Sequence, residues 1–171
     1  EILAASSKLR DRARDLVRNN AYAKKALRIF SDNFVGAGII PEARTASEKL
    51  NKQIMRAWEE WIAHSDVEGT LNFYGLQALI VRSAYESGEC FVRCRDVEFD
   101  NSIVPMQLQV LESDYLDHTK SSESPYTCQG IELDKYGKKV AYWLFNSHPG
   151  DNDVVSAASN KLQSVRISAD E

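Results

Sequence analysis

The sequence lacks the features that would assign it to a membrane, secretory or nucleotide-binding class. No apolar run approaches the roughly 20 residues that a membrane-spanning helix needs. The first residues, EILAASSKLR, do not combine a basic start with an apolar stretch, so no signal peptide is expected. The chain also begins without methionine, and we expect it to be a fragment of a longer polypeptide.

Cysteine is scarce, with Cys90, Cys94 and Cys128 as an odd set that contains no CxxC pair. Cys90 and Cys94 are expected on the same face of one strand, too far apart to form a disulfide. This usage is typical of a protein that folds in a reducing, intracellular compartment.

Histidine is equally rare, and His64, His118 and His148 are dispersed without the close spacing that a zinc site requires. We interpret them as surface or loop residues and predict no metal and no cofactor. The sequence leaves open a nucleophilic pair of Cys90 with His118, but no activating motif surrounds the cysteine. No catalytic residue is therefore predicted.

Two further patterns resemble ligand-binding sites, but the secondary structure expected around each does not fit such a site. Gly36 and Gly38 follow a predicted helix, whereas a phosphate-binding loop needs a strand first and a helix afterwards. The carboxylates of Glu112, Asp114 and Asp117 could hold a metal, but they lie where a strand ends in a turn. Solvated acids are the favoured interpretation of this group.

Charge is unevenly distributed along a chain whose net charge is −4. Residues 1–28 contain eight basic and three acidic residues, and the remainder contains thirteen basic and twenty-two acidic residues. Such a basic segment can meet nucleic acid or an acidic subunit surface, or it can be a solvated helix face with internal ion pairs. The arginines considered as subunit or DNA contacts are Arg10, Arg12, Arg14 and Arg18.

Apolar spacing predicts two helices in the first 40 residues. The first begins at Ser6 or Ser7 as its cap and ends near Arg18, with Leu9, Ala13, Leu16 and Val17 as its apolar stripe. Asn19 or Asn20 caps the second, whose stripe is Ala23, Leu27, Phe30 and Phe34. Gly36 and Gly38 end it.

Two more helices are predicted before the pattern changes. Thr45 to Glu48 has the form of a capping box, and the helix that follows carries the stripe Leu50, Ile54, Ala57, Trp58, Trp61 and Ile62. Another helix is expected from about Asn72 to Ser87, closed by Gly88, with Phe73, Leu76, Leu79, Ile80 and Ala84 facing inward.

After Gly88 the apolar period changes from 3.6 to 2, which indicates strands. Strands are expected around Cys90–Arg95 and Val104–Val110, a polar loop over Lys120–Pro125, and a hairpin with its turn at Asp134–Gly137. A polar, mobile segment is expected over 146–160, and a last strand over Leu162–Ile167. About four N-terminal helices followed by a mostly antiparallel sheet predict an α+β fold.

Several motifs in order resemble the N-terminal part of tailed-phage portal proteins of the lambda family, and the resemblance covers nearly the whole chain. They are RDLVRNN (14–20), DNFVGAGI (32–39), Trp58 with Trp61, LQAL (76–79) with Arg82, GECFVR (88–93), LQVLESD (108–114), GIELD (130–134), VAYW (140–143) and HPG (148–150). The closing VRISAD (165–170) is similar to the segment before the family's next block.

The resemblance implies a structural ring subunit, not an enzyme, with twelve copies at one capsid vertex. DNA passes through such a ring during packaging and ejection, and the terminase large subunit, head-completion proteins and capsid proteins are its partners. It implies a virion or prophage protein, present in the host cytoplasm during assembly, without a membrane partner. The competing hypothesis is a nucleic-acid-binding module that uses the basic helix at 8–28.

The resemblance also implies the domain organisation. Residues 1–40 would be a helical arm with a basic first helix, and residues 41–171 an α+β body belonging to the peripheral wing. The stem, clip and crown of a portal subunit would lie outside this chain.

Overall fold

In the computed structural model, which describes residues 2–97, 104–151 and 162–170, helices occupy the first half of the chain and strands the second. The predicted α+β class is confirmed. Contacts divide the chain into unit 1 (residues 1–111) and unit 2 (residues 112–171), and each has its own sheet and its own buried residues. None of the helices described is long and apolar enough to cross a bilayer.

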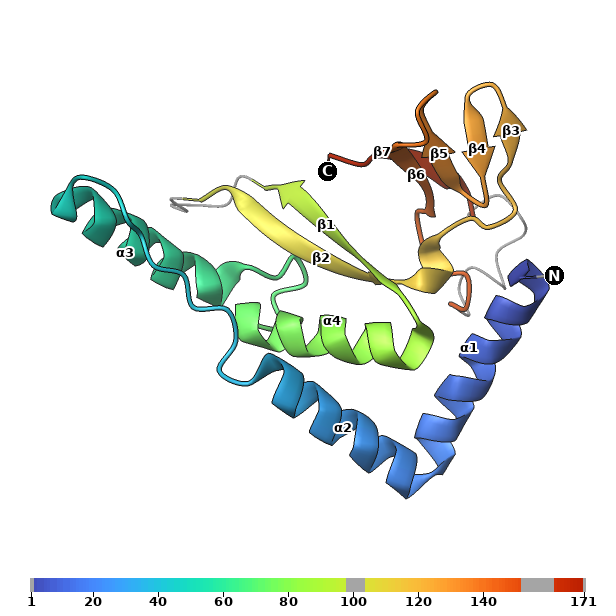
Figure 1. The fold of residues 1–171 in the computed structure, drawn as a ribbon, viewed down its shortest axis with the longest axis horizontal. Coiled ribbons are helices and arrows are strands. Elements are labelled where there is room, and N and C mark those ends of the chain that lie inside the picture. Colours follow the sequence, from blue (N-terminus) through green and yellow to red (C-terminus); the bar gives the residue numbers. More distant parts are fainter. Residues whose placement is uncertain (1, 98–103, 152–161, 171) are drawn as a thin grey trace. The chain divides into compact units, whose positions relative to one another are not determined.

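The first two helices of unit 1, α1 (Ile2–Asn19) and α2 (Ala21–Val35), meet at a sharp bend (Figure 1). Asn20 makes the bend, because its side chain accepts hydrogen bonds from the amides of Tyr22 (2.9 Å) and Ala23 (3.2 Å). The predicted start of α1 at Ser6 or Ser7 is wrong. Both serines lie inside the helix, since nothing in the preceding Ile-Leu-Ala-Ala run interrupts it.

The α1 stripe predicted from spacing matches the buried face only in part, at the half-buried Ala13 and Val17. Leu9 and Leu16 are 64% and 53% exposed, whereas Arg10 is only 7% exposed. The apolar period identifies an amphipathic helix, but it does not show which of two possible faces packs against the rest of the protein. Here the covered face contains an arginine.

Packing of α2 against α4 (Phe73–Ser87) forms the centre of unit 1. Leu27 is buried as predicted, and the Phe30 ring lies 3.5 Å from the Tyr85 ring of α4, centroid to centroid. The Ser31 hydroxyl donates to the Ala78 carbonyl across the two helices at 3.3 Å. Phe34, predicted to be buried, is 69% exposed at the end of the stripe.

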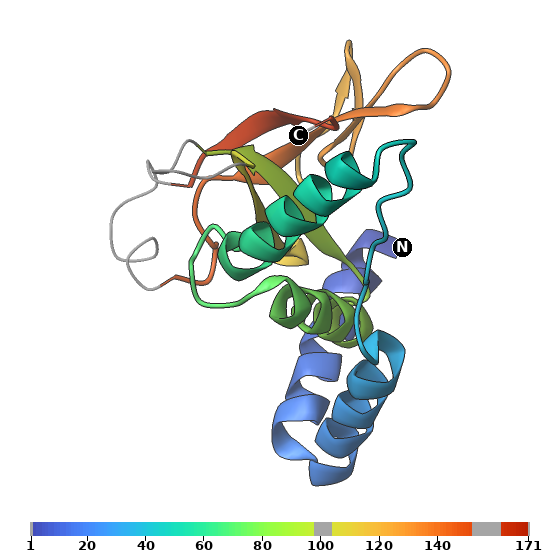
Figure 2. The same cartoon turned by 90° about the vertical axis from the view of Figure 1, so that its left-hand side faces the viewer.

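Residues 36–47 leave α2 as an extended segment (Figure 2). Gly36 caps α2 at a φ of 54°, and Gly38 follows at 78°. A Cβ on Gly38 would lie 2.4 Å from Cδ1 of Tyr74, so glycine is required there for both conformation and space. The predicted exit through these glycines is confirmed.

Ser47, not Thr45, caps α3 (Glu48–His64) by accepting from the Leu50 amide at 3.4 Å. The predicted capping box is therefore wrong, since Glu48 is already the first helical residue. The Asn51 side chain explains the difference: its Oδ1 accepts from the Thr45 amide (2.8 Å) and hydroxyl (2.6 Å). Thr45 is thus engaged elsewhere.

An aromatic cluster packs the C-terminal half of α3. The rings of Trp58, Trp61 and Phe73 lie pairwise 5.1–5.2 Å apart. Trp61 is buried, and its indole N–H donates to the Met106 carbonyl at 2.6 Å. The predicted stripe does not hold over the first half of the helix, where Leu50 and Ile54 are 44% and 42% exposed.

One buried carboxylate organises the loop between α3 and α4. Asp66 is 5% exposed and accepts from the amides of Glu68 (3.1 Å), Thr70 (3.1 Å) and Leu71 (2.9 Å) and from the Thr70 hydroxyl (3.0 Å). Burial alone would raise the pKa of Asp66, but these hydrogen bonds together outweigh it and hold the pKa below its usual value.

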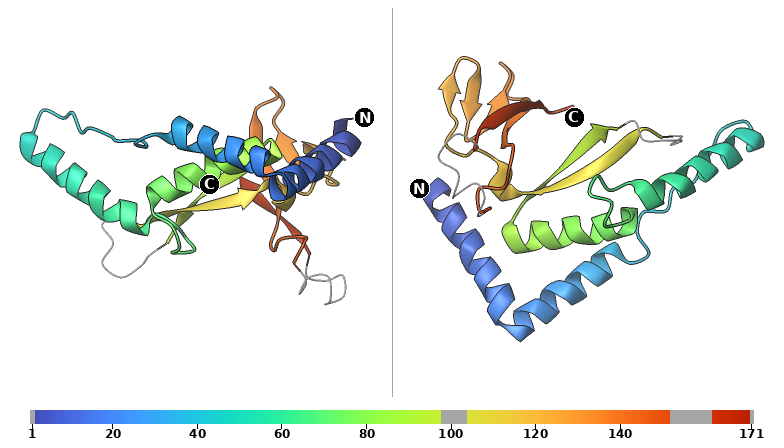
Figure 3. Two further views of the ribbon diagram at one scale, coloured as in Figure 1. Left: turned by 90° about the horizontal axis from the view of Figure 1, so that it is seen from below. Right: turned by 180° about the vertical axis from the view of Figure 1, so that it is seen from behind.

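Asn72 caps the start of α4, within one residue of the predicted beginning, and Gly88 closes the helix as predicted. After Gly88, β1 (Cys90–Asp96) pairs with β2 (Met106–Glu112), and α4 lies between this ribbon and α2 (Figures 1 and 3). Backbone bonds between Leu108 and residues 65 and 67 attach the loop to β2. Cys94, expected on the same strand face as Cys90, is exposed, whereas Cys90 is half-buried.

Unit 2 is an antiparallel meander in the order β3-β4-β5-β6-β7. Its strands are β3 (Ser122–Glu123), β4 (Tyr126–Cys128), β5 (Ile131–Leu133), β6 (Lys139–Phe145) and β7 (Ser164–Ser168). The β5–β6 hairpin, with Gly137 at a φ of 81°, and the last strand confirm the predictions. β3 lies in the segment predicted to be a loop, and β4 was not predicted. Most of the segment 146–160 lies outside the described residues.

The core of unit 2 is small and includes an ion pair. Leu116, Ala141 and Leu144 are buried. Glu132 on β5, 5% exposed, accepts two hydrogen bonds from Arg166 on β7, at 2.8 and 2.9 Å. The Arg166 hydrogen bond is the main reason why the pKa of Glu132 lies below its ordinary value.

Candidate interaction surfaces

The four candidate arginines of α1 do not share one surface. Arg10 pairs with Glu89 at 3.4 Å, and the Arg14 Nε–H donates to the Ser87 hydroxyl at 3.1 Å. These two arginines are four residues apart, so they project from the same face of α1. Both reach the C-terminal end of α4, where cations interact favourably with the helix dipole.

Arg12 and Arg18, in contrast, are exposed, as are Lys8 and Lys25 on α1 and α2. Two of the four arginines therefore pack within unit 1, and two remain available to a partner. Sequence alone could not separate the pairs, because only the position of α4 decides which side of α1 is covered. The role of Arg12 and Arg18 in contacts stays a proposal.

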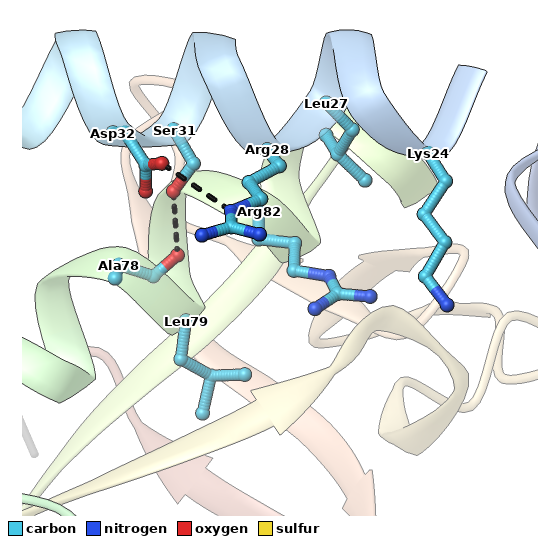
Figure 4. Close-up of a pocket in the computed structure, with 8 residues that line it drawn as sticks. All are labelled: Lys24, Leu27, Arg28, Ser31, Asp32, Ala78, Leu79 and Arg82. Carbon is cyan, nitrogen blue, oxygen red and sulfur yellow. Dashed lines mark hydrogen bonds and ion pairs between the residues drawn. The ribbon is translucent and has the colours of Figure 1, made fainter. Parts of the chain in front are cut away.

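A groove of about 330 Å³ runs between α2 and α4 in unit 1 (Figure 4). Leu27, Ala78 and Leu79 provide its apolar floor, with Leu79 still 37% exposed. The Ser31–Ala78 hydrogen bond closes one end of it (Figure 4). The groove could not be predicted from the sequence, because its residues come from two helices about 50 positions apart.

Cations dominate the rim of the groove. Lys24, Arg28 and Arg82 line it against the single carboxylate of Asp32. Arg28 and Asp32 lie 3.6 Å apart but are 83% and 66% exposed, so this pair is weak. Within the described residues, Lys24 makes no ion pair.

In unit 2, two carboxylates and an imidazole gather at the end of β2. The ligand atoms of Glu112, Asp114 and His148 lie within 4.8 Å of one another, and His148 Nε2 is 3.9 Å from Glu112. Of the carboxylate group predicted from sequence, Glu112 and Asp114 do come together. His148 joins them from the loop after β6, which no sequence signal indicated.

The third member of the predicted group, Asp117, has a separate role. Its carboxylate accepts from the Thr119 amide (3.1 Å) and hydroxyl (2.6 Å). Burial alone would raise the pKa of Asp117, but these hydrogen bonds, together with one from Ser164, lower it. Asp117 therefore stabilises a turn rather than extending the Glu112–Asp114 group.

The spacing of the Glu112, Asp114 and His148 group is wider than a tetrahedral zinc site needs. Ligands at about 2.1 Å from a tetrahedral zinc lie only about 3.5 Å from one another. The 3.9 Å His148–Glu112 separation exceeds this, and the Glu112 side chain is 55% exposed. We assign no ion to the group.

The surroundings of Cys90, the cysteine considered as a nucleophile, disfavour the reactive thiolate form. Burial, and then the negative charge of Glu89, raise the pKa of the Cys90 thiol. The thiol also lies 3.7 Å from the Ile80 carbonyl, to which it donates. A protonated, hydrogen-bonded thiol is a poor nucleophile, so the geometry around Cys90 favours a packing role.

Comparison with known proteins gives these surfaces their context. The chain is 33% identical over 175 residues to a "Probable portal protein" of Halomonas phage phiHAP-1, an alignment that covers 95% of this chain. It spans about a third (33%) of that relative's length. The class that emerges is a structural protein of bacteriophages.

The family is shown by a match over the whole chain. The family model "Phage portal protein, lambda family" matches residues 1–171. The chain belongs to the lambda family of phage portal proteins, as the sequence motifs had indicated.

Proposed function

We propose that this chain is the wing portion of a portal subunit that assembles into a ring at one vertex of a phage capsid. Double-stranded DNA would enter and leave the head through this ring. The terminase large subunit and the head-completion proteins would dock on the completed assembly. The family match over residues 1–171 carries this proposal.

The electrostatics of the described residues support a structural role rather than catalysis. Strongly perturbed ionisable groups commonly mark active sites. Here the described groups with shifted pKa values are Asp66, Cys90, Asp117, Glu132 and Arg166. Each shift has a local cause in burial, a neighbouring charge, a turn or an ion pair within the fold.

The proposed organisation keeps residues 1–40 as a helical arm and 41–171 as the wing body. Stem, clip and crown would correspond to parts of the relative that this chain does not match. Assembly would take place in the host cytoplasm, and the mature location would be the virion. The proposal includes no cofactor, metal or catalytic residue.

Native mass spectrometry of the full-length protein tests the proposal directly. We expect a closed ring, of twelve copies if the family resemblance extends to ring number. Negative-stain images should show a central channel. A full-length protein that stays monomeric at all concentrations would refute the ring.

Exposed Arg12 and Arg18 keep the nucleic-acid alternative open to test. It predicts duplex-DNA binding that weakens steeply with salt, since each phosphate contact releases counterions. The double variant Arg12→Glu/Arg18→Glu should then reduce both the affinity and the salt slope. Arg10 is unsuitable for this test because it is buried in unit 1. Undetectable binding at low salt would exclude the alternative.

A further inference from the structure

We propose that α1 is a hinged arm, which polar contacts hold against the C-terminal end of α4 and which swings away about Asn20 while α2 and α4 stay packed together. The inference concerns a single chain and does not rest on the proposed ring. It also narrows the arm, because within residues 1–40 only α1 moves.

The face of α1 that packs within unit 1 is mostly polar. Between residues 5 and 19, the buried or half-buried positions are Ser6, Arg10, Ala13, Arg14 and Val17, at the spacing of one helix face. Ala13 and Val17 are the two apolar members, and both are only half-buried. The larger apolar side chains of Leu9 and Leu16 are exposed. These residues of α1 therefore contribute little apolar burial to its docking.

Polar contacts connect this face to α4. Arg10 Nη2 lies 3.4 Å from Glu89 Oε1, and the Arg14 Nε–H donates to the Ser87 hydroxyl at 3.1 Å. The Glu89 side chain is 47% exposed, so dissolved ions reach this pair and screen it. The Arg10 guanidinium also regains hydration when it leaves its buried position, which lowers the cost of release.

α2 is attached to α4 by contacts of another kind. Leu27 is buried, and the Phe30 ring packs on the Tyr85 ring. The Ser31 hydroxyl donates to the Ala78 carbonyl. None of these three contacts involves a charged group. Conditions that weaken ion pairs therefore release α1 and leave α2 in place.

Asn20 has the properties of a hinge. This one residue connects α1 to α2 and has an extended backbone, with φ −116° and ψ 115°. Its side chain caps α2, and its own N–H donates to the Leu16 carbonyl of α1 at 2.9 Å. The adjoining helix ends are thus satisfied by residues of the connection. A change of backbone dihedrals at this point can redirect α1 with few hydrogen bonds lost.

Release of α1 changes the charge that the helix presents. In the docked position Arg12 and Arg18 are exposed, whereas Arg10 and Arg14 face α4. After release all four arginines lie in solvent. Docking therefore masks half of the arginines that an acidic partner could reach.

Amide hydrogen exchange of the full-length protein at two salt concentrations tests the inference. An isolated helix of this length is marginally stable, so the amides of a released α1 exchange rapidly. We expect exchange of residues 5–19, measured relative to α2, to be at least about threefold faster at about 0.5 M than at about 0.02 M sodium chloride. The comparison with α2 removes the direct effect of salt on exchange chemistry.

A charge-neutralising variant identifies the contact that holds the arm. Glu89→Gln removes the charge of the pair at nearly constant size. It should accelerate exchange of residues 5–19 at low salt by at least about threefold and reduce the salt dependence. The control Glu59→Gln neutralises an exposed carboxylate on α3 and should leave exchange of α1 unchanged. Exchange of α1 that is independent of salt, or that responds equally to both variants, would overturn the inference.

Discussion

Among single residues, the side chain of Asp66 accepts four hydrogen bonds. Four donors of its own loop converge on its carboxylate, and the loop connects α3 to α4 and contacts β2. Replacement with asparagine would keep one oxygen but place an amide NH2 group where the other oxygen accepts a hydrogen bond. At least one backbone donor would then lose its acceptor, and the others would bond to a neutral oxygen in place of a charged one.

We expect Asp66→Asn to lower the free energy of unfolding by about 2–3 kcal/mol, because buried donors lose a charged acceptor. Urea denaturation followed by circular dichroism measures the change. Glu68→Gln is the control, since it removes an exposed carboxylate of the same loop and should have little effect. Equal stabilities of the two variants would contradict the role assigned to Asp66.

The pair of Glu132 and Arg166 predicts an acid-sensitive unit 2. The folded-state pKa of Glu132 lies below its ordinary value of 4.5, so the pair stabilises fully above about pH 4.5. That stabilisation is lost as the pH falls from there through the lowered folded pKa. Arg166→Met should lower the thermal midpoint at neutral pH and flatten its acid dependence. A parallel pH profile in the variant would count against this linkage.

Structural features that depend only on neighbouring residues could be predicted from the sequence. Asn72 and Gly88 mark the ends of α4 because capping and left-handed conformation depend on the residue itself. The burial of Arg10 and the approach of His148 to Glu112 were not predictable. Each depends on a partner at least 36 positions away, Glu89 in one case and Glu112 in the other, and spacing within an element carries no information about such partners.

Among the elements, α1 packs against the rest of unit 1 through a face that includes Arg10, which the apolar spacing did not predict. We expect Arg10→Met to destabilise its packing on α4 by about 1–2 kcal/mol, since a partly exposed pair and a buried side-chain stem are lost. Arg12→Met should have no measurable effect, because Arg12 is exposed. Amide hydrogen exchange of residues 5–18 reports the difference. The opposite order of effects would show that the other face of α1 is the packed one.

The C-terminal half of α3 depends on Trp61. Truncation to alanine should cost about 3–5 kcal/mol, because a buried indole leaves a large cavity. Trp61→Phe should cost about 1–2 kcal/mol, mainly for the Met106 carbonyl that loses its donor. Chemical denaturation of the unmodified protein and the two variants gives the order of their free energies of unfolding. A phenylalanine variant as unstable as the alanine variant would argue that packing is not the main contribution.

For the whole molecule, the division into two units predicts separable local stabilities. Each unit has its own sheet and its own buried side chains, and such units commonly open as separate cooperative segments. Trp61→Ala should therefore increase amide exchange throughout α3 and α4 while β5 and β6 keep their protection. A uniform loss of protection over residues 2–151 would mean that the two units unfold as one.

The positions of the three tryptophans allow the two units to be followed separately by fluorescence. Trp58 and Trp61 belong to α3 of unit 1, and Trp143 belongs to β6 of unit 2. Removing Trp143 by substitution with phenylalanine leaves fluorescence emission from the N-terminal unit alone. Removing the other two leaves emission from the C-terminal unit alone. The chain thus contains a natural fluorophore for each half, and the denaturation of either can be followed without an added dye.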